Sequence, residues 1–428
     1  MLRFWFALSF AVSLPAAETR EVRILQTTDL HGWIYPHDYY TGRPVDRGLA
    51  KAATLIAEAR RENPNTLLID CGDTIQGSPL ASVYQVARRA KTTALPEPMM
   101  AAMNALRFDA MIVGNHEFNY GLENLEAARA QAKFPWLSAN TIGRPGRGKA
   151  FLPYLIKEVA GVRIAIIGLT TGGIPEWEKK ENYAGLHWED QVEAARRAVA
   201  EVQAKKVDLI VLGVHGGLGR DLKTGRAMTG ELKNDNRVLD LAEALPDVDL
   251  ILYGHTHQIQ EGAKIGKVLL VQARNWGSSV AVVDVKFERQ YGKWLVVDKR
   301  SQLRAVTKET AADPAILELA RPYHEAAEKY LATPLAESPI EMSGERARLE
   351  DTALVDAIHE VQLQAAKADV SFTSLFQQGV RIRKGPVTVR EMAALYIYDN
   401  ELYAIEGHGK MVREALENAA RYFLPCPD

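Results

Sequence analysis

The segment Val22-Arg23-Ile24-Leu25-Gln26-Thr27-Thr28-Asp29-Leu30-His31 carries an apolar, strand-like run directly into two side chains that can bind metal ions. Its first six residues predict a strand over Val22–Thr27. Asp29 and His31 are separated by one residue, so both can face a single cation from the loop that follows. One Asp-x-His pair alone more often reflects ordinary loop polarity than a metal site, so the interpretation depends on whether the pattern recurs.

The same pattern recurs at four further places. Cys71-Gly72-Asp73, Gly114-Asn115-His116-Glu117, Val214-His215-Gly216 and Gly254-His255-Thr256-His257 each follow an apolar run. We therefore predict one active site with seven metal ligands, namely Asp29, His31, Asp73, Asn115, His215, His255 and His257. Mixed nitrogen and oxygen donors suit Mn²⁺, Zn²⁺ or Fe²⁺ better than Mg²⁺ or Ca²⁺, and the choice among the three stays open. We expect two divalent ions, bridged by the Asp73 carboxylate.

A two-metal centre indicates the reaction class. Two metal ions about 3.5–4 Å apart clamp the attacking and leaving oxygens of an in-line phosphoryl displacement and lower the pKa of a bound water. We expect phosphoester hydrolysis by metal-activated hydroxide, with His116 and Asn115 as catalytic residues. Asn115 is a neutral ligand, and His116 follows it directly, so His116 should point past the metal and stabilise the transition state or protonate the leaving oxygen. We expect Glu117 to accept hydrogen bonds from loop amides.

Strand-like and helical runs alternate from Val22 to about Val297, which indicates an α/β domain built in layers. The predicted strands are Val22–Thr27, Thr66–Asp70, Ala110–Val113, Val162–Leu169, Leu209–Val214, Leu250–Tyr253, Val268–Gln272, Val280–Phe287 and Trp294–Val297. The predicted helices are Leu49–Arg60, Leu122–Lys133, Asp190–Ala204 and Arg237–Leu245. The last strand runs have no helix between them, so we expect a mixed sheet.

The chain is expected to contain more than one domain. We place a signal peptide at 1–17, the metal-binding domain at 18–310, a linking helix within 311–335 and a second α/β domain at 336–428. The helix at Asp313–Leu331 could equally be a packed terminal helix of the first domain. In the second domain we predict helices at Thr352–Lys367, Val389–Leu395 and Lys410–Arg421, and strands at Val370–Thr373 and Leu402–Glu406.

The N-terminus has the pattern of a secretory signal: basic Arg3, an apolar stretch from Phe4 to Leu14, and small residues at Ala16 and Ala17. A buried strand or helix is the alternative, and the stretch is too short to span a bilayer. We therefore expect export to the periplasm or the extracellular medium, with no membrane span. The 428 residues carry a net charge of only −2 and two cysteines, which argues against nucleic-acid polymers as partners and against a disulfide scaffold.

Taken together, Thr28–His31, Gly72–Pro79, Gly114–Gly121 and Gly254–His257 closely resemble the calcineurin-like metallophosphoesterases. More narrowly they resemble the exported 5′-nucleotidase family, and most of all its 2′,3′-cyclic-nucleotide 2′-phosphodiesterase/3′-nucleotidase branch. The resemblance implies a four-layer α-β-β-α sandwich with mixed sheets, followed by a smaller nucleotide-recognition domain. It also implies one metal held by Asp29, His31, Asp73 and His257, and a second held by Asp73, Asn115, His215 and His255.

The resemblance extends to substrate binding. Tyr398 and Asn400, in Tyr396-Ile397-Tyr398-Asp399-Asn400, resemble the family's base-stacking segment, and Arg381 resembles its arginine loop. Asn119 stands where 5′-nucleotidases commonly carry an Asp that pairs with the catalytic His, which favours the cyclic-phosphodiesterase branch. The family's C-terminal domain continues beyond the position of Asp428, so we expect this chain to hold only part of it.

These features predict an exported hydrolase of small-molecule nucleotides that prefers 2′,3′-cyclic diesters and 3′-monoesters. A 5′-nucleotidase or nucleotide-sugar hydrolase with the same metal centre is the first alternative. A nucleotide-binding or adhesion module with a structural metal is the alternative from another class. The sequence does not determine the oligomeric state, and we expect a monomer.

Overall fold

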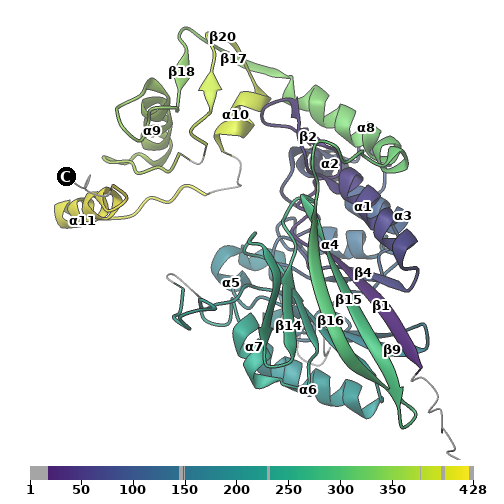
Figure 1. Cartoon of the computed structure of the whole chain (residues 1–428). Coiled ribbons are helices and arrows are strands. Elements are labelled where there is room, and N and C mark those ends of the chain that lie inside the picture. Colours follow the sequence, from purple (N-terminus) through teal and green to yellow (C-terminus); the bar gives the residue numbers. More distant parts are fainter. Residues whose placement is uncertain are drawn as a thin grey trace, which may run out of the picture. The chain divides into compact units, whose positions relative to one another are not determined.

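The computed structural model describes residues 18–143, 148, 150–228, 232–375, 377–396 and 401–423 (Figure 1). The predicted signal peptide at 1–17 and the predicted substrate residues Tyr398 and Asn400 lie outside these ranges. The chain divides into two compact units, Met1–Lys329 and Tyr330–Asp428. Within the described ranges, every helix is too short or too polar to cross a lipid bilayer.

The first unit contains two six-stranded sheets, and both are mixed. The first sheet has the order β16 (Lys293–Ala305), β15 (Ser279–Gln290), β1 (Thr19–Thr27), β4 (Thr66–Asp70), β5 (Ala110–Ile112) and β6 (Trp136–Leu137). Strands β1, β4, β5 and β6 are parallel, whereas β15 and β16 run antiparallel to their neighbours. The mixed sheet expected from the helix-free run of final strands is therefore confirmed.

The second sheet has the order β13 (Gln260–Ile265), β14 (Val268–Gln272), β12 (Leu250–Tyr253), β11 (Leu209–His215), β9 (Val162–Thr170) and β8 (Tyr154–Val159). Its four central strands are parallel and its two edge strands are antiparallel. Parallel central strands all end at the same edge of a sheet, so the loops that follow β9, β11 and β12 are brought together.

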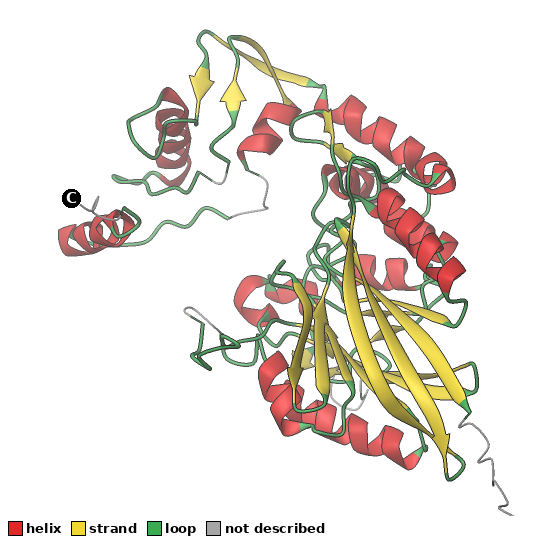
Figure 2. Cartoon of the chain, in the orientation of Figure 1, coloured by secondary structure: helices red, strands yellow, loops and turns green. Residues whose placement is uncertain are grey.

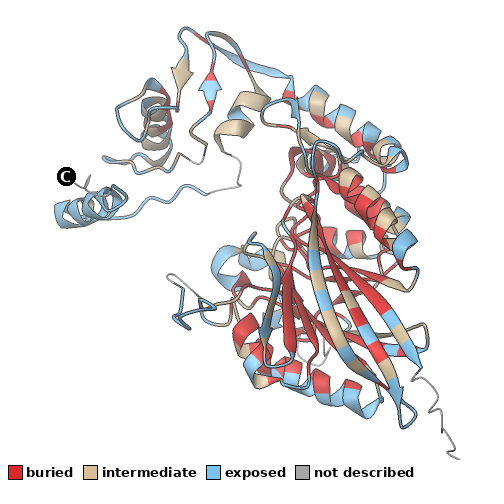
Figure 3. Cartoon of the chain, viewed as in Figure 1, coloured by how far each residue is buried: buried red, intermediate tan, exposed pale blue. Residues whose placement is uncertain are grey.

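Four layers result from the way apolar faces are buried. The two sheets pack face to face through residues such as Ile24 and Ile112 of the first and Ile164 and Val211 of the second. Helices α1 (Leu49–Glu62), α3 (Pro98–Ala105) and α4 (Leu122–Arg129) cover the first sheet, and α6 (Gln191–Ala204) and α7 (Val238–Ala244) cover the second. Figure 2 shows strands at the centre of this unit with helices outside them. Figure 3 shows that the inner strands are largely buried, whereas the edge strand β16 and the helices are partly exposed. The predicted α-β-β-α sandwich is confirmed.

Two helices of eight or more residues in the first unit were not predicted. Helix α2 (Pro79–Arg89) begins at a Ser78 cap, whose hydroxyl accepts from the Ala81 amide, and α3 is apolar on most of its surface. Short helices that begin with proline and lack a clear polar face give little helical periodicity in the sequence. The remaining short elements are β2 (His37–Asp38), β3 (Arg43–Pro44), β7 (Thr141–Ile142), α5 (Ile174–Trp177), η1 (Lys180–Tyr183) and β10 (His187–Trp188).

Helix α8 (Pro314–Leu331) lies where a helix was predicted, and the division between the two units falls within it. In the second unit, β17 (Pro334–Ser338) pairs with β20 (Gly385–Thr388), and β18 (Met342–Ser343) pairs with β19 (Arg381–Ile382). Helices α9 (Ala353–Ala366), α10 (Val389–Leu395) and α11 (Gly409–Ala420) agree with the three predicted helices. The strands predicted at Val370–Thr373 and Leu402–Glu406 are wrong, because neither segment forms a strand. Their apolar residues, including Ile405, are largely exposed, so apolar character alone misled the prediction.

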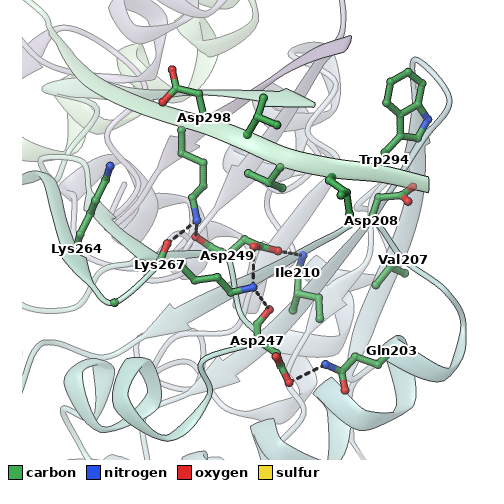
Figure 4. Close-up of a pocket in the computed structure, with 15 residues that line it drawn as sticks. Gln203, Val207, Asp208, Ile210, Asp247, Asp249, Lys264, Lys267, Trp294 and Asp298 are labelled. Carbon is green, nitrogen blue, oxygen red and sulfur yellow. Dashed lines mark hydrogen bonds and ion pairs between the residues drawn. The ribbon is translucent and has the colours of Figure 1, made fainter. Parts of the chain in front are cut away.

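A cavity of about 680 Å³ lies at the amino ends of the second sheet, where Asp249 precedes β12 and Lys267 precedes β14 (Figure 4). Two of the three lysines that line it, Lys267 and Lys299, are already engaged. Lys299 Nζ donates to the carbonyl oxygens of Asp249 and Lys267, at 2.7 and 2.5 Å. Lys267 Nζ lies 3.3 Å from the Asp249 carboxylate. No residue of the predicted active site lines this cavity, so it is separate from the motifs at the carboxyl ends of the strands.

Candidate metal centre

All five sequence motifs meet at the carboxyl ends of the strands. Backbone hydrogen bonds join the loops: the Asp29 amide donates to the Gly72 carbonyl at 2.8 Å, and the His31 amide donates to the Asp73 carbonyl at 2.8 Å. The two sheets are joined there as well, because the His255 amide donates to the Asp29 carboxylate at 3.0 Å. The motifs therefore lie together in one place, where we predicted a single site from their recurrence.

The seven predicted ligands fall into two adjoining groups. Donor atoms of Asp29, His31 and His257 lie within 4.8 Å of one another, and so do donor atoms of Asp73, His215 and His255. The Asn115 amide oxygen lies 3.0 Å from His215 Nε2, which puts it in the second group. Asp73 Oδ2 lies 3.0 Å from His215 Nε2 and 3.9 Å from His31 Nε2, so this carboxylate adjoins both groups. That is the position expected of a bridging ligand.

The donor set fits a pair of divalent ions. His31 Nε2 and His257 Nε2 face each other at 3.0 Å, and Asp29 Oδ1 lies 3.6 Å from His257 Nε2. Ring nitrogens and a carboxylate that converge in this way match the mixed ligation of Zn²⁺, Mn²⁺ or Fe²⁺. The structure therefore supports two sites, with Asp29, His31, His257 and Asp73 available to one and Asp73, Asn115, His215 and His255 available to the other.

Charges inside the cluster prepare it for cations. Burial alone would raise the pKa of Asp73, but the imidazoles of His215 and His116 outweigh burial and hold it well below its usual range. Burial lowers the pKa of His31 to about 3, so its imidazole is neutral, as ligation requires. Burial would also lower the pKa of His215, but Asp73 outweighs it and raises the pKa to about 10. The proton that His215 shares with Asp73 thus lies where a cation can replace it.

Backbone strain is concentrated in the same loops. Five of the seven predicted ligands have positive φ: Asp29 (51°), His31 (48°), Asp73 (57°), His255 (76°) and His257 (56°). A non-glycine residue in the left-handed region costs about 1–2 kcal/mol, and such residues gather where the surrounding structure enforces a functional geometry. The loops are held in this form so that their side chains turn inward toward one point.

Close packing of the loops requires glycine at two positions. A Cβ on Gly114 would lie 2.4 Å from Asp73 Oδ1, and a Cβ on Gly254 would lie 2.0 Å from Thr28 Oγ1. Neither backbone segment could approach its neighbouring loop if it carried a side chain. The glycine that precedes Asn115 and the one that precedes His255 are therefore needed to bring the loops together.

Glu117 holds the loops together, as predicted. One carboxylate oxygen accepts from the amides of Asp73 and Gly114, at 3.0 and 2.7 Å. The other accepts from the amides of Thr74 and Ile75, at 2.6 and 3.3 Å. The side chain is fully buried, and it ties the loop after β4 to the loop after β5. Glu117 therefore fixes the backbone on which Asp73 and Asn115 are carried.

His116 lies beside the cluster and is partly open to solvent. Its side chain is 34% exposed, whereas that of His215 is fully buried. Its Nε2 is 3.9 Å from Asp73 Oδ2, and its Nδ1 is 2.5 Å from Asn119 Oδ1. The ring is therefore accessible to solvent and its Nε2 faces the cluster, which suits a residue that contacts the substrate.

The predicted substrate residue Arg381 has a different setting from the one expected. It opens strand β19 rather than lying in a loop, and its guanidinium lies 3.4 Å from Glu341 and 3.3 Å from Glu345. Tyr398 and Asn400 lie outside the described residues. Of the three predicted substrate contacts, the described residues therefore include Arg381 alone.

Two features around the cluster were missed in the sequence. Asp235, which is 5% exposed, lies 3.2 Å from His255 Nε2 and can orient that ring. The Arg47 guanidinium lies over the rings of Trp33 and Trp276, with 3.9 and 4.5 Å to the ring centroids. Trp276 in turn contacts the His257 ring. Neither Asp235 nor Arg47 follows a strand within a recognisable motif, so only their proximity to the cluster in the fold could reveal them.

Comparisons with known proteins agree with this geometry. The sequence model of the calcineurin-like phosphoesterases matches residues 22–259, which include all seven predicted ligands. The chain belongs to this family. Its members are phosphoester hydrolases with a dinuclear metal centre, and residues 331–425 match the 5′-nucleotidase C-terminal domain. The fold is thus a calcineurin-like phosphoesterase domain followed by a separate C-terminal domain.

Three relatives illustrate the similarity. The 2′,3′-cyclic-nucleotide 2′-phosphodiesterase/3′-nucleotidase of Salmonella typhimurium is 33% identical over 96% of this chain and 70% of its own length. A candidate 5′-nucleotidase of Staphylococcus aureus, solved with α-ketoglutarate, is 26% identical with a TM-score of 0.76, over 88% of this chain and 72% of that one. The calcineurin-like phosphoesterase YfkN of Bacillus subtilis is 29% identical with a TM-score of 0.65, over 73% of this chain and 99% of that one.

Proposed function

We propose that this phosphoesterase hydrolyses nucleotide phosphoesters and prefers 2′,3′-cyclic diesters and 3′-monoesters. The observation that carries the proposal is the gathering of seven mixed donors in two adjoining groups that Asp73 connects, with His116 Nε2 3.9 Å from the Asp73 carboxylate. Two bound divalent ions would supply the charge that attracts a phosphate and lowers the pKa of the attacking water. The protein would supply the rest: ligands in a fixed geometry and an imidazole beside the leaving oxygen.

Each residue has a distinct part in this proposal. Asp29, His31 and His257 would hold one ion, Asn115, His215 and His255 the other, and Asp73 both. His116 would donate a hydrogen bond from Nε2 to the oxygen that departs from phosphorus. Arg381, Tyr398 and Asn400 remain the proposed contacts for the nucleoside.

The choice of branch rests on one residue of the chain and on the name of one relative. The family resemblance implies that Asn119 stands where 5′-nucleotidases commonly have Asp. The relative from Salmonella typhimurium bears the name of a cyclic phosphodiesterase and 3′-nucleotidase. The second candidate is a 5′-nucleotidase or nucleotide-sugar hydrolase, and the likeness to the Staphylococcus aureus structure favours the 5′-nucleotidase. Both candidates use the same metal centre, so only substrate preference separates them.

Substrate preference is tested by kcat/KM for 2′,3′-cyclic AMP, 3′-AMP, 5′-AMP and UDP-glucose with added Mn²⁺. We expect the first two to be hydrolysed best. Exclusive hydrolysis of 5′-AMP would refute the branch assignment, and no hydrolysis of any ester would refute the function. Metal analysis of the purified protein would identify the ions among Mn²⁺, Zn²⁺ and Fe²⁺.

Asp73→Ala separates an enzyme from a nucleotide-binding module with a structural metal. In an enzyme the variant loses a metal ion and at least about a thousandfold in kcat, because Asp73 adjoins both groups of ligands. A pure binder would keep its nucleotide affinity, and the wild type would show no turnover. Asp298→Ala, on the exposed edge strand β16, is the matched control and should leave metal content and turnover unchanged.

Residues 1–17 are proposed to be a secretory signal that directs the enzyme out of the cytoplasm. The proposal is supported by the basic, apolar and small-residue regions in that order. Expression of the full chain followed by N-terminal sequencing of the exported protein would test it. An N-terminus near Glu18 is expected, and retention of Met1 in the cytoplasmic fraction would contradict it.

A further inference from the structure

Behind His116 lies a chain of hydrogen bonds that no sequence motif indicates. His116 Nδ1 is 2.5 Å from Asn119 Oδ1, and Asn119 Nδ2 donates to Glu178 Oε2 at 2.5 Å. His116 and Asn119 belong to the segment between β5 and α4, whereas Glu178 directly follows helix α5. These hydrogen bonds thus connect the accessible imidazole of the site to a carboxylate 59 residues later in the sequence than Asn119.

Glu178 is itself held in place. Its Oε1 accepts from Asn182 Nδ2 at 2.8 Å and from the Lys179 amide at 2.7 Å. Asn182 Nδ2 also donates to the backbone carbonyl oxygen of Asn119 at 3.1 Å, so Asn182 connects Glu178 to Asn119. Both oxygens of Glu178 therefore face donors, which is the pattern of an ionised carboxylate.

The donor and acceptor capacities along the chain permit only one arrangement. An ionised carboxylate can only accept, so the Asn119 amide must turn its NH₂ group to Glu178. Its carbonyl oxygen then faces His116 Nδ1, and a carbonyl oxygen can only accept. His116 must therefore carry a hydrogen on Nδ1, so Nε2, the ring atom directed at the cluster, can donate only when the ring is an imidazolium with a hydrogen on both nitrogens. A proton given from Nε2 to the leaving oxygen then leaves the neutral ring with its hydrogen on Nδ1. The orientation of an asparagine amide is otherwise free, because its last torsion has two nearly equivalent states.

We propose that Glu178 is a positioning residue of this enzyme, which locks the Asn119 amide so that His116 keeps its Nδ1 hydrogen and directs Nε2 to the leaving oxygen. The inference rests on the proposed hydrolysis, since it concerns the departure of an alkoxide. Asn119 and Glu178 together would do what a single aspartate does when it accepts directly from a histidine. The neutral amide transmits the orientation, and the carboxylate one step further away supplies the negative charge.

A purely structural role is the competing explanation, because Glu178 also ties α5 to the turn at Asn119. The two roles differ in their dependence on the leaving group. A tether affects every substrate alike. A residue that orients His116 matters when the leaving group is a nucleoside alkoxide, which needs a hydrogen bond or a proton, and matters little for p-nitrophenolate, which is already a stable anion.

The test compares Glu178→Gln with wild type on 3′-AMP and on bis-p-nitrophenyl phosphate. Glutamine can donate or accept, so the Asn119 amide is free to turn and to present NH₂ to His116. We expect kcat on 3′-AMP to fall about 10- to 100-fold with little change in KM, and kcat on the aryl diester to fall less than about threefold. Glu176→Gln, which is exposed in the short helix α5 that precedes Glu178, is the matched control and should behave as wild type.

The double variant Asn119→Asp/Glu178→Gln supplies the decisive result. The aspartate introduced at position 119 accepts from His116 directly, and the glutamine introduced at position 178 donates to that aspartate. The hydrogen bond between residues 119 and 178 thereby runs in the opposite direction, while residue 119 still accepts from His116 Nδ1. We expect this double variant to regain most of the kcat on 3′-AMP that Glu178→Gln loses. Glu178→Asp keeps the charge but retracts it by one methylene, and it should show a smaller loss with the same dependence on the leaving group.

Three outcomes would overturn the proposal: unchanged kcat in Glu178→Gln, equal losses on both substrates, or a double variant no better than the single one. Circular dichroism and metal content measured on each variant identify folding defects, and Glu178→Asp then provides the comparison. Failure of the proposed function has a different signature, because the wild type itself would then hydrolyse no nucleotide. In that case a methyl phosphodiester replaces 3′-AMP as the substrate with an alkoxide leaving group, and a p-nitrophenyl phosphodiester remains the aryl substrate. The comparison then tests the role of Glu178 by itself.

Discussion

Glu97 provides a quantitative test of the energetics of the first unit. It is 2% exposed and caps helix α3, where Oε2 accepts from the Met100 amide at 2.6 Å. Among the described residues, Oε1 has no hydrogen-bond partner. Burial, and to a smaller extent the charge of Glu117, raises the pKa of Glu97 to about 8 from an ordinary value of 4.5. The folded protein therefore holds a proton that the unfolded chain releases.

The direction of the pH effect on stability follows from the linkage between protonation and unfolding. A raised folded-state pKa means that stability is fully present below the unfolded pKa and is lost as pH rises toward the folded pKa. With about 1.4 kcal/mol for each unit between the two pKa values, the loss is about 2 kcal/mol at pH ~6 and about 4 kcal/mol at pH ~8. Glu97→Gln keeps the shape and the acceptor for Met100 but has no proton to lose. The variant should therefore be increasingly more stable than the wild type as pH rises from ~5 to ~8.

The assay is urea unfolding of the full metal-loaded chain at several pH values, followed by tryptophan fluorescence. All seven tryptophans precede residue 330, so the fluorescence reports on the first unit. The difference in unfolding free energy between variant and wild type removes effects that both proteins share. A difference that stays constant across this pH range would refute the assignment of a protonated, buried Glu97. A difference that grows in the opposite direction would show that Glu97 is ionised and stabilising.

Further predictions concern the loops of the metal centre. Glu117→Gln places an NH₂ group against two backbone amides that now donate to a carboxylate oxygen, so we expect metal affinity to fall at least about tenfold, measured by metal content after dialysis. Retention of both ions at wild-type affinity would contradict the role given to Glu117. Gly254→Ala forces a Cβ to 2.0 Å from Thr28 Oγ1, and it should lower stability by about 1–3 kcal/mol and reduce turnover, whereas Gly409→Ala, which meets no atom within 4 Å, should do neither. Removal of divalent ions with a chelator should abolish hydrolysis of every ester and lower the melting temperature, and added Mn²⁺ should restore both; unaffected turnover would argue against metal-dependent catalysis.

The fold was predictable from sequence where apolar periodicity and length agreed. Strands such as Leu209–His215 are fully buried and read as continuous apolar runs, so their positions were found within a residue or two. Periodicity failed in the second unit, where Leu402–Glu406 is apolar in composition but exposed and not a strand. An isolated apolar run carries no information about whether a neighbouring strand exists to pair with it. It likewise failed for α3, whose short apolar sequence has no polar face.

The ligands were predictable because each motif is local. A residue that ends a buried strand, or follows it by up to three positions, must lie at the end of a sheet, whatever the remainder of the chain does. Asp29, Asp73 and His215 were identified from that rule together with their chemistry, and the structure brings their donor atoms into adjoining groups. What surrounds the ligands was not local. Asp235, which lies against His255, follows no strand and belongs to no motif.

The sequence by itself determined the reaction class, since side-chain chemistry and position at strand ends are properties of short segments. Only the tertiary structure decided how His116 is supported. In the sequence, Asn119 suggests that the carboxylate expected behind the histidine is missing, because the sequence does not show which residue the Asn119 amide contacts. In the fold Glu178 lies behind it at 2.5 Å, although it is 59 residues away along the chain. Hydrogen-bond partners far apart in sequence are set by how loops from different strands are brought together, and no periodicity or motif in either segment encodes that distance.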